Sequence, residues 1–137
     1  MRSIDYIVLH CTATSKSAKV SSIQKYWKER LGWKNPGYHF IVEQDGNIKQ
    51  LQDLEKPTNG VRGYNSNSIH ISYIGGKEVD DRTPEQEIAL EAIVKVLHAM
   101  FPKAKIQGHR DFPGVKKSCP RFDAIPWSQN ILNERSN

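Results

Sequence analysis

Alternating and continuous apolar segments in the chain predict its strands. Residues 4–11 are apolar on both alternating faces, which is typical of a central strand. The segments 38–42 and 48–51 are separated by a turn sequence that contains Asp45-Gly46, and they predict a β-hairpin. Residues 68–73 and 104–107 are further strand candidates, and Gly75-Gly76 ends the first of these two.

Helical spacing of apolar residues occurs between these strands. Residues 22–31 predict a helix that ends at Gly32, with Trp27 in the core. The sequence Thr83-Pro84-Glu85-Gln86 combines an N-cap hydroxyl, a proline at the first helical position and a glutamine that completes a capping box, so we expect a helix from there to Met100. Residues 123–132 are expected to form a last short helix. The apolar stripe that we expect the long helix to pack on the sheet consists of Ala89, Ile93, Val96, Leu97 and Met100.

Strands separated by helices, together with one hairpin, predict an α/β fold. We expect a single domain over residues 1–137 whose mixed central β-sheet is flanked by helices on both sides, since the chain is too short for two ordinary domains. Folds of this kind place their sites at strand ends and in the loops beyond them.

The charge balance narrows the choice of partners. There are 20 Lys and Arg against 15 Asp and Glu, a net charge of +5, which favours a polyanionic partner such as nucleic acid, anionic lipid or an acidic wall polymer. The basic residues never form a run of five, so no dedicated nucleic-acid site is expected. Apolar runs are too short to span a membrane, and the start of the chain lacks the apolar region of a signal peptide. We therefore expect synthesis in the cytoplasm without a signal peptide, no membrane partner, and a monomer.

Three residues with metal-binding side chains fall at predicted strand ends. His10 lies near the end of the first strand, and His109 and Cys119 bracket the loop after the last one. Two imidazoles and a thiolate would fill three corners of a zinc tetrahedron and leave the fourth for water, as in catalytic zinc sites. The spacing alone is a weak signal, because a structural histidine and an inert buried cysteine are common alternatives. Cys11 alternates to the opposite face of its strand, and we expect it in the core.

Five motifs follow one another along the chain: VLHCTAT at 8–14, GYHFI at 37–41, GYNSNSI at 63–69, TPEQ at 83–86, and GHRD with KSCP between 108 and 120. In this order they resemble the type 2 N-acetylmuramoyl-L-alanine amidases, a family that includes small phage lysozyme-amidases and peptidoglycan recognition proteins. The resemblance extends from about residue 4 to 122. It implies cleavage of the amide bond between the lactyl group of N-acetylmuramic acid and the L-alanine of the peptidoglycan stem peptide.

The resemblance also implies roles for single residues. His10, His109 and Cys119 match the family's zinc ligands, and Tyr38 and Lys117 match its catalytic tyrosine and lysine. Zinc is then the cofactor, and peptidoglycan is the partner. The Lys117 ammonium would stabilise negative charge on the carbonyl oxygen, and Tyr38 would hold or relay a proton of the water. A phage or prophage lysis enzyme that acts on the cell wall after release is the function implied.

Two positions depart from the family pattern. The branch of the family that recycles wall fragments has a glutamate where this chain has Ser72, so acid–base work is expected to fall to Tyr38. Most relatives have a glycine where this chain has His70. For His70 we weigh packing or hydrogen bonding behind the metal site first, substrate contact second and direct ligation last. His39 is expected to be structural, and His98 to be a packing or surface residue.

The loop between residues 56 and 67 is the candidate substrate-binding segment. We expect Arg62 to meet a stem-peptide carboxylate, Asn65 and Asn67 to meet sugar or peptide, and Trp33 to stack on the glycan. Two other functions stay open. A non-catalytic peptidoglycan-binding module is expected to lose a ligand such as Cys119, which is retained here, and a regulator would bind another macromolecule independently of hydrolysis.

Overall fold

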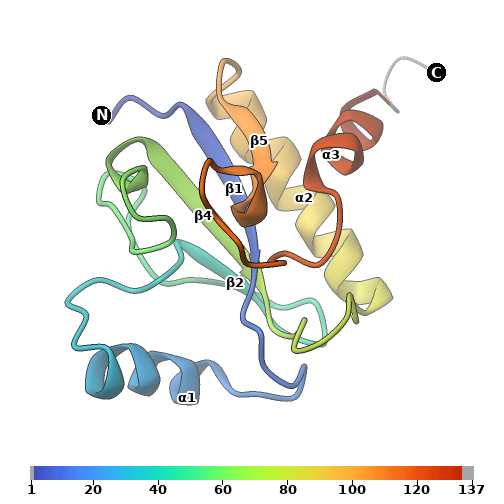
Figure 1. The fold of residues 1–137 in the computed structure, drawn as a ribbon. Coiled ribbons are helices and arrows are strands. Elements are labelled where there is room, and N and C mark those ends of the chain that lie inside the picture. Colours follow the sequence, from blue (N-terminus) through green and yellow to red (C-terminus); the bar gives the residue numbers. More distant parts are fainter. Residues whose placement is uncertain (1, 134–137) are drawn as a thin grey trace.

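The computed structural model describes residues 2–133, and its centre is one mixed sheet of five strands (Figure 1). The strands follow the order β3-β2-β4-β1-β5. The elements in chain order are β1 (Tyr6–Cys11), α1 (Val20–Lys25), a π-helical turn (Tyr26–Arg30), β2 (Phe40–Val42), β3 (Ile48–Gln50), a 3₁₀ turn (Asn65–Asn67), β4 (Ser68–Tyr73), α2 (Pro84–Met100), β5 (Lys105–Gly108), a second 3₁₀ turn (His109–Asp111) and α3 (Ala124–Asn133).

The topology confirms the strands expected from the sequence. β1 lies between β4 and β5 and is parallel to both, β2 is parallel to β4, and β2 and β3 form the antiparallel hairpin. In the register of β1 with β4, Val8 is opposite His70 and His10 is opposite Ser72. His10, His70 and Ser72 therefore project from the same face of the sheet.

Helices cover both faces of the sheet, as expected for the α/β class. α2 and α3 lie together on one side and α1 on the other (Figure 1). On the α2 side, Leu90, Val94 and Leu97 pack against sheet residues such as Ile7 and Ile71. The opposite side is covered in two parts. α1 and the π-helical turn pack on Ile41 and Ile74, and loops cover Val8 with Val61 and Phe112; the α1-side cluster is Val20, Ile23, Trp27, Ile41 and Ile74.

The long helix α2 begins as its sequence predicts. Thr83 accepts a hydrogen bond from the Gln86 backbone N–H, and the Gln86 side-chain oxygen accepts one from the Thr83 N–H. Its predicted apolar stripe is partly wrong, because Val96 and Met100 are 56% and 49% exposed. The buried stripe is rotated toward Gln86, and its apolar members are Ala89, Leu90, Val94 and Leu97.

The first helix also differs from its prediction. It begins at Val20 and changes into a π-helical turn at Tyr26, in which the Leu31 N–H donates to the Tyr26 carbonyl oxygen. Trp27 is in the core, as expected, and stacks on Trp33 with ring centroids 6.4 Å apart. The turn therefore holds a pair of indole rings at the edge of the α1 side of the sheet.

Candidate metal centre

The carboxyl ends of two parallel strands bring three metal-binding side chains together. His10 lies near the end of β1, and His109 follows β5 directly, at the start of a 3₁₀ turn. The chain then comes back to the same place at Cys119. Donor atoms of His10, His109 and Cys119 all lie within 4.8 Å of one another. His10 Nδ1 is 4.0 Å from Cys119 Sγ, and the two histidine ring centroids are 4.9 Å apart. The convergence expected from the sequence is present.

The electrostatics of this cluster favour neutral imidazoles. Burial, followed by the nearby His70, His109 and Lys117, lowers the pKa of His10 well below its ordinary value. Burial and Lys117 also lower the pKa of His109. The neighbouring Cys11 side chain and burial raise the pKa of the Cys119 thiol, so a bound cation would have to displace its proton. Two neutral imidazoles and one thiol of this kind fit a zinc ion, which accepts nitrogen and thiolate ligands.

The Cys119 sulfur is also held by the backbone. The Cys11 N–H donates to Cys119 Sγ over 3.0 Å, while the Cys11 side chain itself is buried in the α2-side core. The Arg110 N–H donates to the Cys119 carbonyl oxygen over 2.9 Å, which ties the segment that carries Cys119 to the turn that carries His109. The expectation that Cys11 lies in the core is confirmed.

A cavity of about 170 Å³ lies over the cluster. Tyr38 lines it, with its ring centroid 4.9 Å from that of His10, and its hydroxyl donates to the Cys11 carbonyl oxygen over 3.3 Å. Burial, followed by Cys119, raises the pKa of Tyr38, so its hydroxyl keeps its proton at neutral pH. The other lining residues are His10, Cys11, Thr12, Ala13, Trp27, Trp33, Gly37, Asn59, Gly60, His109, Lys117 and Cys119.

The cavity continues into a larger apolar groove of about 730 Å³. Trp27, Trp33, Tyr38 and Lys117 line both spaces, so the groove starts at the metal cluster. Farther from the cluster it is lined by Tyr26 and other residues of the α1 region, among them Ala18, Ser22, Ile23 and Leu31. Trp33, predicted to stack on a glycan, is thus at the junction of the two spaces.

The remaining predicted substrate residues lie outside the cavity wall. The Asn65 side-chain oxygen accepts hydrogen bonds from the backbone N–H groups of Gly60 and Val61, and Asn67 donates to Asp5. Their polar groups thus hold the loop in shape, while Arg62 is exposed. Gly60, in contrast, reaches the cavity wall. The polar composition of the loop indicated a binding segment, but it could not show which amides the loop uses for its own hydrogen bonds.

His39 and His70 lie behind the cluster. His70 is fully buried, and its Nδ1 is 2.8 Å from His10 Nε2. His39 is fully buried beneath it and stacks on the His70 ring with centroids 6.2 Å apart. Burial is the main cause that lowers the pKa of His39 to about 4, and Arg2 adds to it. His39 is structural, as expected, but its contact with His70, which joins β4 to the residue that precedes β2, could not be foreseen from the sequence.

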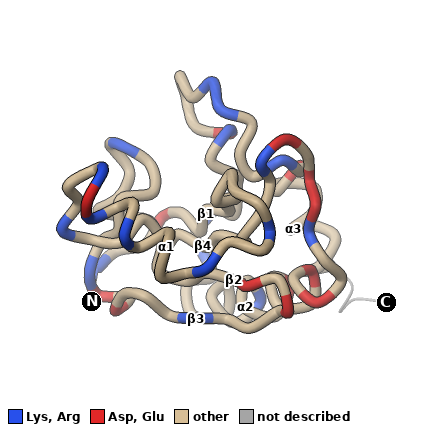
Figure 2. Tube along the Cα trace, turned by 90° about the horizontal axis from the view of Figure 1, so that it is seen from below, with Lys and Arg blue, Asp and Glu red and all other residues tan. Residues whose placement is uncertain are grey.

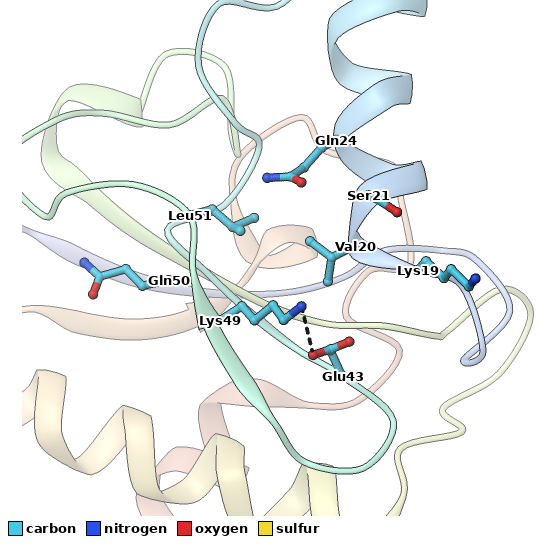
Figure 3. A pocket seen from close by; sticks show the side chains of 8 residues that line it. All are labelled: Lys19, Val20, Ser21, Gln24, Glu43, Lys49, Gln50 and Leu51. Atoms are coloured by element: carbon cyan, nitrogen blue, oxygen red, sulfur yellow. Dashed lines mark ion pairs between the residues drawn. The ribbon is translucent and has the colours of Figure 1, made fainter.

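Within residues 2–133, His10, His109 and Cys119 form the one group of histidine, cysteine or acidic side chains that could hold a metal ion. The hollow in Figure 3 lies between α1 and β3, has a volume of about 540 Å³, and contains an ion pair between Lys49 and Glu43 with an N–O distance of 3.6 Å. Its lining includes neither histidine nor cysteine. Lys and Arg recur at separate places along the chain, with Asp and Glu between them (Figure 2). Among the described residues, no helix combines the length and apolar character needed to cross a membrane.

In sequence, the chain is similar to phage endolysins. The chain is 34% identical over 125 residues to the endolysin of Enterobacteria phage K11, a match that covers 87% of this chain and 82% of the relative. It is 33% identical over 133 residues to the endolysin of Escherichia phage T7, with 91% and 85% covered.

Solved structures share the fold. The Ph2119 endolysin from a Thermus scotoductus bacteriophage superposes with a TM-score of 0.81 at 24% identity, over 96% of this chain and 86% of that one. The amidase LysC from Clostridium intestinale gives a TM-score of 0.79 at 24% identity, with 98% and 87% covered. The model of the family described as N-acetylmuramoyl-L-alanine amidase matches residues 1–122, which include all three metal-binding side chains. The chain therefore belongs to the N-acetylmuramoyl-L-alanine amidase family.

Proposed function

We propose that the protein is a zinc-dependent amidase of phage lysis type that hydrolyses the bond between N-acetylmuramic acid and L-alanine in peptidoglycan. The observation that carries the proposal is the cluster of His10, His109 and Cys119, whose donor atoms lie within 4.8 Å of one another beside a cavity. In this proposal the three side chains hold the zinc ion. When bound, zinc supplies Lewis-acid polarisation of a carbonyl group and lowers the pKa of a coordinated water molecule.

Lys117 and Tyr38 are the proposed catalytic residues, and both line this cavity. The Lys117 ammonium stabilises the negative charge that develops on the carbonyl oxygen of the amide under attack. The raised pKa of Tyr38 keeps its hydroxyl protonated, and that proton is donated to the Cys11 carbonyl oxygen. The hydroxyl oxygen is then free to accept a hydrogen bond from the attacking water and to hold or relay its proton. Its hydrogen bond to the Cys11 carbonyl fixes the ring beside His10.

The groove that leaves the cavity is the proposed path of the substrate. Trp33 lies where the cavity and the groove meet, and its indole ring offers an apolar face to a sugar ring. Lys117 at the same junction offers a positive charge to the acidic stem peptide. In this proposal the scissile amide lies at the cluster and the rest of the muropeptide lies along the α1 region.

The test is hydrolysis of purified peptidoglycan by the purified protein, measured as newly released N-terminal alanine. We expect release that stops on treatment with a chelator and returns with added zinc, and that is lost in Cys119→Ser and kept in His98→Ala, since His98 lies on α2 away from the cluster. New reducing sugar ends without new amino termini would identify a glycosidase and overturn the proposal. Salt-sensitive association with a macromolecule, unchanged by chelator and without hydrolysis, would instead support a regulator.

A further inference from the structure

His70 belongs to neither the cluster nor the cavity wall, yet it touches a proposed metal ligand directly. It lies on β4, two residues before the partner of His10 in the β1 register, and its ring projects from the same face as the ring of His10. His70 Nδ1 is 2.8 Å from His10 Nε2, and the ring centroids are 4.9 Å apart. The contact uses the nitrogen of His10 that is remote from Cys119, because the other one, Nδ1, faces the Cys119 sulfur.

The hydrogen bonds around His70 determine which nitrogen carries a proton. The Asn65 side-chain oxygen accepts from two backbone N–H groups, over 3.1 Å from Gly60 and 2.8 Å from Val61. His70 Nε2 lies 2.9 Å from the same oxygen, so Nε2 must carry a proton and donate it. In a neutral His70 the remaining nitrogen, Nδ1, is then an acceptor. The facing Nε2 of His10 must be the donor, which leaves a free lone pair on His10 Nδ1.

The ring of His70 is also fixed in position by its surroundings. A Cβ atom on residue 60 would lie 2.3 Å from His70 Nδ1, so the ring fits only because that residue is glycine. On another side the ring stacks on His39, whose Nδ1 accepts the backbone N–H of His70 over 3.1 Å. His39 in turn donates from Nε2 to the Lys56 carbonyl oxygen over 2.7 Å. In both the His39 and the His70 ring, Nε2 then donates and Nδ1 accepts.

We propose that His70 is a positioning residue for the metal centre. By accepting the Nε2 proton of His10, it selects the tautomer whose Nδ1 lone pair points to the metal position, and Asn65 and Gly60 hold His70 in the orientation that this requires. The proposal rests on the metal site of the proposed function. Partners of this kind orient a ligand before the metal arrives, and their removal typically lowers metal affinity by about 10–100-fold.

The first experiment needs no variant. Long-range ¹H–¹⁵N correlation spectra of the metal-free wild-type protein report which ring nitrogen of His10 is protonated. We expect protonation at Nε2 and a bare Nδ1. A His10 ring protonated at Nδ1, or one that averages between both tautomers, would overturn the proposal, whether or not any variant folds.

The second experiment measures zinc affinity by competition with a chromophoric chelator. His70→Phe keeps an aromatic ring but removes the acceptor, and we expect zinc affinity to fall about 10–100-fold. In His70→Asn the side-chain oxygen can take the place of Nδ1, so affinity should recover in part. His98→Phe on α2 is the matched control and should bind zinc like the wild type.

Gly60→Ala tests the same contact from the other side. The added methyl group would collide with the His70 ring, so zinc affinity should fall in the presence of His70 and should fall much less when Gly60→Ala is combined with His70→Gly. If the wild type binds no stoichiometric zinc, the proposed function fails. If it binds zinc and His70→Phe binds it equally well, only the positioning role is refuted.

Discussion

Protonation of His39 should couple the stability of the fold to pH. The ring is fully buried, its Nδ1 accepts a backbone N–H from His70, and the Arg2 guanidinium lies 3.2 Å from its Nε2. A second proton on His39 would therefore create a positive charge that no solvent stabilises. It would also occupy Nδ1, so the His70 N–H would lose its hydrogen-bond acceptor. These causes, burial foremost, lower the pKa of His39 to about 4, against about 6.5 in the unfolded chain.

The direction of the effect follows from proton binding. As the pH falls through about 6.5, the unfolded chain takes up this proton and the folded protein does not, so the free energy of unfolding decreases until the pH nears 4. The contribution is complete above pH 6.5 and is lost across this window. A difference between a pKa of about 6.5 and one of about 4 corresponds to about 3 kcal/mol.

The assay is urea unfolding of chelator-treated protein at a series of pH values between about 4 and 7. Other buried histidines add to the wild-type pH dependence, so the quantity compared is the difference between variants. His39→Asn keeps an acceptor near the His70 N–H but cannot titrate, and its loss of stability over the window should be smaller by about 3 kcal/mol. His98→Asn is the control and should follow the wild type. An identical pH dependence in His39→Asn and wild type would refute the reasoning.

Three further predictions concern activity and packing. Lys117→Ala should lower turnover roughly 10²–10³-fold with zinc content unchanged. The turnover of Lys116→Ala, a change at an exposed neighbour, should stay near that of the wild type. Loss of zinc in Lys117→Ala would indicate a structural role instead. Gln86→Leu removes hydrogen bonds to the Val42 and Ile74 carbonyls and should lower the free energy of unfolding by about 2–4 kcal/mol in urea, whereas a change below about 1 kcal/mol would mean that these carbonyls find other partners. Leu90→Ala in the core should cost about 2–5 kcal/mol, and Ile88→Ala, at a site 70% exposed on the same helix, should stay within about 0.5 kcal/mol; similar losses at both sites would contradict the burial.

Features with local causes could be predicted from the sequence. The capping box at Thr83 is present because its atoms lie within four residues of one another, and the strand at 68–73 was predicted with the bounds that the structure has. The metal-binding side chains could be expected to converge because parallel strands share a carboxyl edge. His10 and His109 follow that rule directly, and the Cys119 backbone is tied to the same turn.

Features that depend on distant partners could not be predicted. Which side of α2 is buried depends on its angle to the sheet, so the exposure of Val96 could not be read from helical spacing. The contacts of the Asn65 side-chain oxygen with Gly60, Val61 and His70 form only once the loop is folded against β4, so the sequence could not show them. The space that His70 occupies likewise depends on a glycine that lies in that loop.

His10 and Cys119 are 109 positions apart in the chain. An ion bound by both would act as a cross-link that closes a loop of most of the polypeptide through coordinate bonds, and closing so long a loop costs an unfolded chain the most conformational entropy. Loss of the ion would therefore do more than silence the enzyme. It would also remove the link between the first strand and the C-terminal quarter of the chain. When the metal is scarce, proteases should therefore degrade the protein faster.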